Sequence, residues 1–414
     1  MAIPGATPSS VQGIGRRLAE RFALIAFGLY HVPLFLNNYP SLGGGGFNDT
    51  GLAVQWGRIF TVPGLWVAQH LFGVASPGGA NGDNGDTAEE FARVLLCVVI
   101  GIAGAIVWTV ADRRRPRAEW TESVLRVLLR YSIVLGLMGY AIAKILPQQF
   151  PPLTLPALER RVGDLTPMAL LWTFMQFSRP YAFMAGLLEL VPIVLLCFRR
   201  TALLGALVCL PVMLNVTLMN YAYGVPVKLY ATMITLSCIV LILYDAPRLL
   251  DLFVRNRPVG ASRESTIVQD RVAWHWRAAI KFVVVGSVVV SCVRAMSGTL
   301  AGPPPPTSAA TGTWQVVPLT PDAPWRRLTI DGAGVLIRTA DDVAIRCALD
   351  SFPVAGPLSM QCRDGRRGTF DWTRSSDTLR LEGTFDGAPV SFVATWVDRT
   401  SYTLMRSEFR WFFD

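Results

Sequence analysis

A few ionisable and amide side chains of this chain stand inside long apolar runs or at their ends, where burying polarity is costly. Glu189 lies within one run and Asn215 within the next, while Lys144 and Lys228 lie near the ends of two others. A carboxylate that cannot reach the membrane surface must be protonated, paired with a cation or exposed to a wet cavity. Such groups could exchange protons with a ligand or hold its polar end.

Depth counted along the chain, at about 1.5 Å per residue, brings these side chains together. Glu189 and Asn215 lie at similar depth, and Asn220 and Lys228 lie above them at the rim. We therefore expect a polar pocket in the outer half of the membrane, with Glu189 paired to Lys144 or Lys228, and almost no polar side chains in the inner half. The expected catalytic residues are Glu189, Lys228 and Lys144, and the expected ligand-binding residues are Asn215, Asn220, Tyr140, Gln148 and His31.

Most of these residues also have a structural role open to them. A lysine near the end of a span can extend to the headgroups, and asparagines can hydrogen-bond between helices. His31, two residues before Pro33, suits a helix end. Tyr140 and Gln148 lie one turn on either side of Lys144 and share its helix face. Glu189 has no route to the surface, so it favours a functional site most strongly.

The apolar runs are long enough to cross a membrane. The 414-residue chain is 52% hydrophobic and 16% charged, with a mean hydropathy of +0.40, whereas a soluble domain carries about 25% charged residues. A helical span needs about 20 apolar residues. We predict seven spans, at about 18–36, 91–111, 122–146, 181–198, 201–222, 227–246 and 274–296.

Basic residues gather between alternate pairs of these spans. Arg16 and Arg17 precede the first, "DRRRPR" (112–117) joins the second to the third, and Arg199 with Arg200 joins the fourth to the fifth. The positive-inside rule then places the N-terminus in the cytoplasm and the C-terminus outside. This clustering accounts for the net charge of +9, so we expect a lipid bilayer rather than a nucleic acid as the partner.

Composition changes completely after the seventh span. The Pro-rich stretch "SGTLAGPPPPTSAATGT" (297–313) predicts a linker. Residues 314–414 contain short alternating runs rich in β-branched and aromatic residues, punctuated by Asp-Gly turns at 331, 364 and 386. The predicted fold is thus multi-domain: a helical membrane domain (1–296) and an extracytoplasmic antiparallel β-domain (314–414), either a sandwich or a barrel.

The seven cysteines do not suggest a metal site, because no CxxC or Cys/His spacing occurs. Five lie in predicted spans and suit apolar packing. Cys347 and Cys362 lie on neighbouring predicted strands in the segment expected outside, where an oxidising compartment would allow a disulfide. We therefore expect no metal and one candidate disulfide.

Two outer loops contain semi-apolar segments. Residues 54–73, interrupted by Pro63, predict a re-entrant or interfacial segment. Thr166 as N-cap with Pro167 at the first helical position predicts the start of a short helix. Residues 248–263 suit an amphipathic stretch on the membrane surface, and "FRWFF" (409–413) suits closure of the β-core or docking of a partner.

Three stretches carry a resemblance to a known family: "GYAIAKILPQQFPP" (139–152), "GDLTPMALLWTFMQFSRPYAFMAGLLEL" (163–190) and "RRTALLGALVCLPVMLNVTLMNYAYGVPVKLY" (199–230). Together they resemble the DoxX-like family of bacterial membrane proteins over roughly 120–250, a four-helix core. In those relatives an Asp follows the tyrosine of "NYAYGVPVKL", where this chain has Gly224.

The resemblance implies a bacterial inner-membrane protein, since name-giving members are associated with a thiosulfate:quinone oxidoreductase. We accordingly expect a quinone-linked redox component, with Lys228 and Lys144 polarising a carbonyl and Glu189 handling protons. The sequence has no haem, flavin or iron–sulfur signature, so a quinone is the one expected cofactor and electrons require a partner subunit. The alternative is a non-catalytic scaffold or accessory subunit of a larger membrane complex, with the β-domain docking a periplasmic partner.

Overall fold

The computed structural model forms two compact units. It describes residues 14–37, 52–74, 86–112, 119–260, 309–317, 325–332, 334–350 and 356–406, with Phe282, Gly286 and Val290. The helical unit comprises Met1–Gln149 and Tyr181–Ser297, and the barrel unit comprises Phe150–Pro180 and Gly298–Asp414. The segment Phe150–Pro180, which the sequence predicts as part of the helical domain, thus groups with the barrel.

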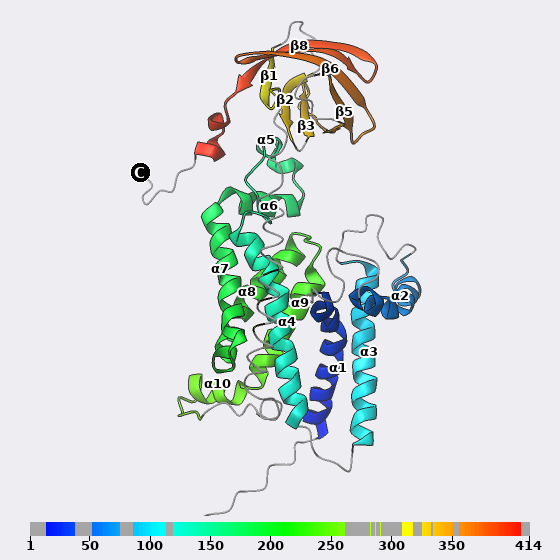
Figure 1. Cartoon of the computed structure of the whole chain (residues 1–414), viewed down its shortest axis with the longest axis vertical. Helices are drawn as coiled ribbons and strands as arrows, with labels where there is room; N and C mark the ends of the chain where they lie inside the picture. Colours follow the sequence, from blue (N-terminus) through cyan, green and yellow to red (C-terminus); the bar gives the residue numbers. More distant parts are fainter. Residues whose placement is uncertain are drawn as a thin grey trace, which may run out of the picture. The chain divides into compact units, whose positions relative to one another are not determined.

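The helical unit contains the apolar helices that the sequence predicts (Figure 1). Its helices are α1 (Ile14–Asn37), α2 (Leu52–His70), α3 (Ala88–Ala111), α4 (Glu119–Ile145), α7 (Arg179–Cys197), α8 (Ala202–Ala222), α9 (Lys228–Leu243) and α10 (Ala246–Phe253), with the short 3-10 helix η3 (Arg199–Thr201) before α8. The predicted interfacial segment lies largely in α2, which runs across one end of α3.

Within the described residues, four helices are long and apolar enough to cross a membrane: α3, α4, α7 and η3 with α8. A fifth is added if α9 and α10, bent by 69° at a short break, count as one span. Helix α1 covers the first predicted span but is not among these helices. The seventh predicted span, 274–296, lies almost wholly outside the described residues.

Helix α4 is the centre of the helical unit. Its buried residues Leu125, Leu129 and Ile133 belong to the unit's apolar core. Helix α7 approaches it closely at Gly186, where a Cβ would lie 2.8 Å from the Ala141 carbonyl oxygen. Because the helices approach so closely, a side chain three residues from Gly186 on the same face also meets α4.

A buried ionic network lies at the N-terminal end of α4. The Arg126 guanidinium pairs with Asp245 at 3.0 Å and with Glu122 at 2.8 Å. Arg248 also pairs with Asp245, at 2.6 Å. Arg130 donates two hydrogen bonds to the Leu196 carbonyl, at 3.0 and 2.8 Å. These groups secure α4 to the end of α7 and to the break between α9 and α10.

The expectation that one half of the helices would contain almost no polar side chains is wrong. Arg126 precedes Lys144 by 18 positions, which corresponds to about 27 Å along α4. Arg126, Arg130 and Asp245 are all buried. Polar groups therefore lie inside the bundle toward both ends of α4, because each end supplies partners that satisfy them.

The barrel unit is a closed antiparallel barrel in the order β1 to β8, with β8 returning to pair with β1. The barrel is one of the two alternatives that the sequence left open. The strands are β1 (Gly312–Val317), β2 (Trp325–Asp331), β3 (Gly334–Thr339), β4 (Ala344–Leu349), β5 (Leu358–Cys362), β6 (Arg367–Ser375), β7 (Thr378–Phe385) and β8 (Ala388–Val397).

Alternating residues fill the barrel interior. Trp325 stands at its centre, with ring centroids 5.6 Å from Phe370, 5.1 Å from Phe385 and 5.2 Å from Phe392. The predicted Asp-Gly turn at 386 forms the two-residue connection between β7 and β8. There Asp386 and Gly387 both have positive φ, 53° and 79°, as a type I′ turn requires.

The segment Phe150–Asp164, here named the cover segment, packs on the outside of strands β2 and β3. It contains α5 (Leu155–Leu158) and the 3-10 helix η2 (Val162–Asp164), and α6 (Pro167–Phe177) follows it. Leu336 and Arg338 alternate with the inward residues of β3, yet are only 4% and 7% exposed. The cover segment thus shields an outer face of the sheet. Helix α6 begins as predicted, with the Thr166 hydroxyl accepting from the Ala169 amide at 3.2 Å.

Glu159 attaches the cover segment to the barrel. Its carboxylate accepts from Arg327 at 2.9 Å and from the Tyr402 hydroxyl, and its carbonyl accepts from Arg338 at 2.5 Å. Burial and the bond to Glu159 raise the pKa of Tyr402 to about 12, so the phenol remains a neutral donor. Arg399 adds a bond to the Leu153 carbonyl at 2.8 Å.

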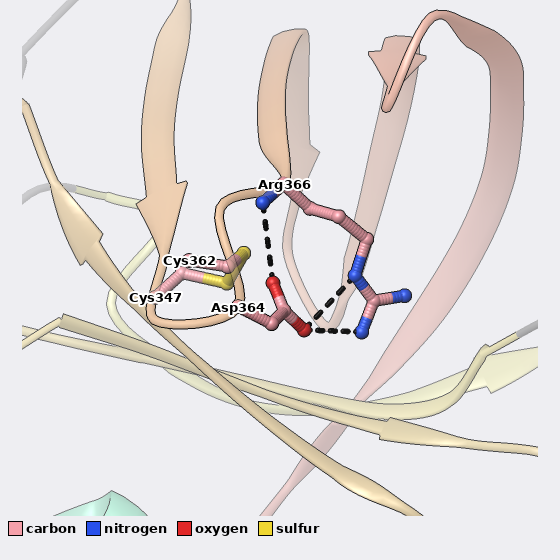
Figure 2. Close-up of a disulfide and its surroundings, with 4 residues drawn as sticks. All are labelled: Cys347, Cys362, Asp364 and Arg366. Atoms are coloured by element: carbon pink, nitrogen blue, oxygen red, sulfur yellow. Dashed lines mark hydrogen bonds and ion pairs between the residues drawn. A yellow bond between two sulfur atoms is a disulfide. The ribbon is translucent and has the colours of Figure 1, made fainter.

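A disulfide joins Cys347 on β4 to Cys362 on β5, the pair that the sequence suggests (Figure 2). The two residues are direct cross-strand partners. In the turn that follows, Asp364 accepts a bond from the Arg366 amide and pairs with its guanidinium, which holds the pKa of Asp364 below its ordinary value. The disulfide closes a loop of sequence separation 15.

Breaking this disulfide is expected to destabilise the barrel. Closure of a 15-residue loop restricts the unfolded chain and contributes about 3 kcal/mol. The Cys347→Ser/Cys362→Ser variant of the full chain should lose that amount in denaturant unfolding followed by tryptophan fluorescence. Replacing the free thiols Cys97 and Cys209 by Ala is the control for general effects of cysteine removal. An unchanged midpoint in the disulfide variant would contradict the expectation.

The ionic network predicts a second effect on stability. Asp245→Asn removes one of the two carboxylates that pair with the buried Arg126 guanidinium, at a cost of about 3 kcal/mol. Asp251→Asn removes the same charge from an exposed pair with Arg255 and should cost less than about 0.5 kcal/mol. Thermal unfolding of both variants in one detergent compares them directly, and equal losses would rule out a special role for the buried pair.

Candidate functional site

The best-defined candidate site is a buried ion pair between α4 and α7. The Lys144 ammonium lies 2.9 Å from the Glu189 carboxylate, with side chains 10% and 3% exposed. Of the two partners that the sequence left open for Glu189, the structure has Lys144. Gly186 explains this choice, because the close approach of the helices there brings Glu189, one turn later, against the last turn of α4.

Two tyrosines line the same region. The Lys144 ammonium lies 5.6 Å from the centre of the Tyr140 ring, within range of a cation–π interaction. The Tyr140 and Tyr230 rings are 6.0 Å apart, which adds α9 to the site. The Tyr230 hydroxyl lies against Gly136, where any Cβ would overlap it. The Lys144–Glu189 pair is therefore bordered by the Tyr140 phenol, on the same helix as Lys144. The Tyr230 phenol of α9 lies beyond it.

Lys228 is engaged elsewhere, by Asp86. The Asp86 carboxylate accepts from the backbone amides of Lys228 at 2.7 Å and Leu229 at 3.1 Å, and lies 3.4 Å from the Lys228 ammonium. A carboxylate at this position satisfies free amides of the first turn of α9 and complements its dipole. Lys228 thus belongs to a helix cap rather than to the Glu189 pair.

The described contacts of His31 and Asn220 are with groups other than Glu189. His31 is buried with its ring 3.3 Å from the Ser237 hydroxyl. The Asn220 amide lies 3.5 Å from the Val227 carbonyl, across the turn between α8 and α9. Asn215 is exposed on α8 and does not join the pair, and Gln148 is half-buried just beyond α4. The structure therefore brings together Lys144, Glu189 and Tyr140.

Sequence reasoning missed two sets of charged residues. Glu122, Arg126 and Arg130 recur every fourth position of α4, and this spacing could have revealed an internal charged stripe. Asp86 follows a Gly- and Asn-rich stretch and had no comparable signal, because its partners lie far along the chain. Within the described ranges, no group of three or more His, Cys, Asp or Glu residues could hold a metal ion.

The Asp86 cap predicts a graded series. Asp86→Ala removes both the cap and the charge and should destabilise the protein by about 1 kcal/mol. Asp86→Asn keeps a capping oxygen, so most of that stability should remain. Thermal unfolding in detergent measures both, with Glu89→Gln on the first turn of α3 as the charge control. If Ala and Asn behave alike and match the unmodified chain, Asp86 does not cap α9.

Comparison with known proteins gives one informative relative. No family model matches the chain, and no solved structure matches it. The uncharacterized protein YwoB of Bacillus subtilis is 30% identical over 132 residues, which are 32% of this chain and 83% of YwoB. The similarity therefore spans most of YwoB and about a third of this chain. On this similarity, the chain belongs to the same family as YwoB.

Proposed function

We propose that this protein is a multi-pass membrane protein that binds a quinone, or another amphiphile with a carbonyl head group, beside the Lys144–Glu189 pair. The buried ion pair between α4 and α7 is the observation that carries the proposal. Burying two charges is costly, so ionisable side chains inside a membrane span mark candidate functional sites. The resemblance to the DoxX-like family, with its quinone-linked members, supports the same ligand class.

The pair suits proton-coupled chemistry. Lys144 can donate a hydrogen bond to a carbonyl oxygen, while Glu189 can accept the proton that the amine gives up. Reduction of a quinone to a quinol takes up two electrons and two protons. The pair holds one transferable proton, which it would give to one quinone oxygen; water would supply the proton for the second oxygen and the proton that restores the pair. The electrons would come from a redox partner, since the chain contains no signature of a haem, flavin or iron–sulfur centre.

The proposed location is a bacterial inner membrane, with the N-terminus in the cytoplasm and the barrel unit outside. The clustering of Arg between alternate spans favours this orientation. The Cys347–Cys362 disulfide is in keeping with an oxidising compartment for the barrel.

A second candidate function is that of a non-catalytic accessory subunit in a larger membrane complex. The observation that favours it is the mutual satisfaction of Lys144 and Glu189, which is also the arrangement expected of a purely structural ion pair. In that case the barrel unit would dock a partner protein outside the membrane.

Ligand retention separates the two functions. The full chain purified in mild detergent should carry a quinone detectable by mass spectrometry. Lys144→Met/Glu189→Gln removes both charges together, which avoids leaving one buried alone, and should reduce retention at least about tenfold, as loss of a charged hydrogen bond implies. Arg93→Met/Glu90→Gln removes a matched pair on α3 and should retain the quinone.

Equal quinone content in both double variants, at equal midpoints of thermal unfolding, would contradict the proposed site. A chain that never retains a quinone but purifies with a stoichiometric partner would support the accessory function instead.

A further inference from the structure

Two arginines face each other on the outside of the barrel. Cys347 and Cys362 are cross-strand partners, so the next pair in the register is Arg346 and Arg363, and the Arg363 amide donates to the Arg346 carbonyl at 3.0 Å. The cysteines belong to the barrel core. Successive side chains of a strand point to opposite faces, so Arg346 on β4 projects outward. Arg363, the first residue of the turn after β5, lines the same outer cavity.

A third arginine reaches the same place from the cover segment. Arg160 directly follows Glu159, whose bonds to Arg327 and Arg338 fix this part of the chain. Burial, together with the positive charges of Arg346 and Arg363, lowers the pKa of the Arg160 guanidinium. The three arginines line one cavity of about 390 Å³.

The cavity holds more positive than negative charge. Among its described lining residues the acidic one is Asp350, against three guanidinium groups. Neighbouring arginines of the barrel unit are paired: Arg327 with Glu159, Arg338 with Asp342, and Arg366 with Asp364 in the turn drawn in Figure 2. None of the described carboxylates forms an ion pair with Arg160, Arg346 or Arg363. Among the described residues of the cavity, Asp350 alone offsets the positive charges that Arg346 and Arg363 place near Arg160.

We propose that this cavity, lined by Arg160, Arg346 and Arg363, is a binding site for a phosphate group. Guanidinium groups bind phosphate through paired, charge-assisted hydrogen bonds. Three of them, contributed by β4, the turn after β5 and the cover segment, suit a tetrahedral anion with several oxygens better than a carboxylate with two. Thr154 and Gln361 add polar groups to the lining. The cavity exceeds a bare phosphate, so it accommodates a phosphate ester, either soluble or the headgroup of a phospholipid.

Binding of soluble esters tests the proposal on the full chain in a neutral detergent. Glycerol 3-phosphate and inorganic phosphate are titrated by calorimetry at low ionic strength, where screening is weak. Arg346→Gln and Arg363→Gln should each weaken binding about tenfold, the effect of removing one charged hydrogen-bond donor. Arg380→Gln, which removes an exposed charge from β7 of the same barrel, should leave affinity unchanged. Equal affinity of all three variants for these ligands would overturn the proposal. So would failure of the unmodified chain to bind either glycerol 3-phosphate or inorganic phosphate.

The midpoint of thermal unfolding, measured with and without phosphate, distinguishes a phosphate-binding arginine from a purely structural one. Without anion, Arg346→Gln relieves the repulsion and should leave the midpoint of thermal unfolding unchanged or higher. With phosphate, the unmodified chain should gain stability and the variant should not. A variant that is less stable than the unmodified chain by the same amount with and without phosphate would contradict the site. Glutarate serves as the carboxylate probe. If glutarate binds as tightly as glycerol 3-phosphate, the site does not prefer phosphate over carboxylate and the proposal is wrong.

A second arm distinguishes the source of the phosphate. The chain is placed in nanodiscs of phosphatidylcholine alone or with phosphatidylglycerol, and glycerol 3-phosphate is titrated again. A lipid headgroup in the cavity would weaken the soluble ester only in the phosphatidylglycerol discs, and Arg346→Gln/Arg363→Gln would abolish that difference. Equal affinity in both discs identifies a soluble ester. The proposal does not depend on the quinone site, so either can fail alone.

Discussion

The buried ion pair of Lys144 and Glu189 fixes α7 against α4 in the helical unit. Both side chains are nearly removed from solvent, and their nitrogen and oxygen lie 2.9 Å apart. Removing one partner would leave an uncompensated charge between α4 and α7, which is among the costliest defects a buried site can have. The close approach at Gly186 exists at the same level, so packing and electrostatics require each other there.

Buried polar contacts also fix the N-terminal end of α4. Arg126 and Arg130 bind groups from other helices, Asp245 and the Leu196 carbonyl, as firmly as Lys144 binds Glu189. An apolar middle separates the two polar ends, with Leu129 and Ile133 fully buried. The bundle is thus specified by polar contacts at both ends of one helix and by apolar packing between them.

Four of the seven predicted spans coincide with described helices that are long and apolar enough to cross a membrane, because length and hydropathy are properties of a continuous segment. The β-domain followed from alternation and Asp-Gly turns, but its closure into a barrel depends on β1 meeting β8 about 80 residues later, which no local pattern encodes. Glu189 could be singled out from its position alone. Asp86 could not, since its role appears only where α9 begins, more than a hundred residues away. Residue counting gave the depth of Asn215 but not its helix face, and its side chain is exposed on α8.

The barrel unit shows the opposite electrostatic situation. Arg160, Arg346 and Arg363 share a cavity with a single described carboxylate, so this cavity holds more positive than negative charge. In the helical unit, infrared difference spectroscopy tests most directly whether a quinone meets the Lys144–Glu189 pair. Adding a short-chain quinone should perturb a carboxyl or carboxylate band that disappears in Glu189→Gln. A difference spectrum identical in the unmodified chain and in Glu189→Gln would show that the ligand does not meet the pair.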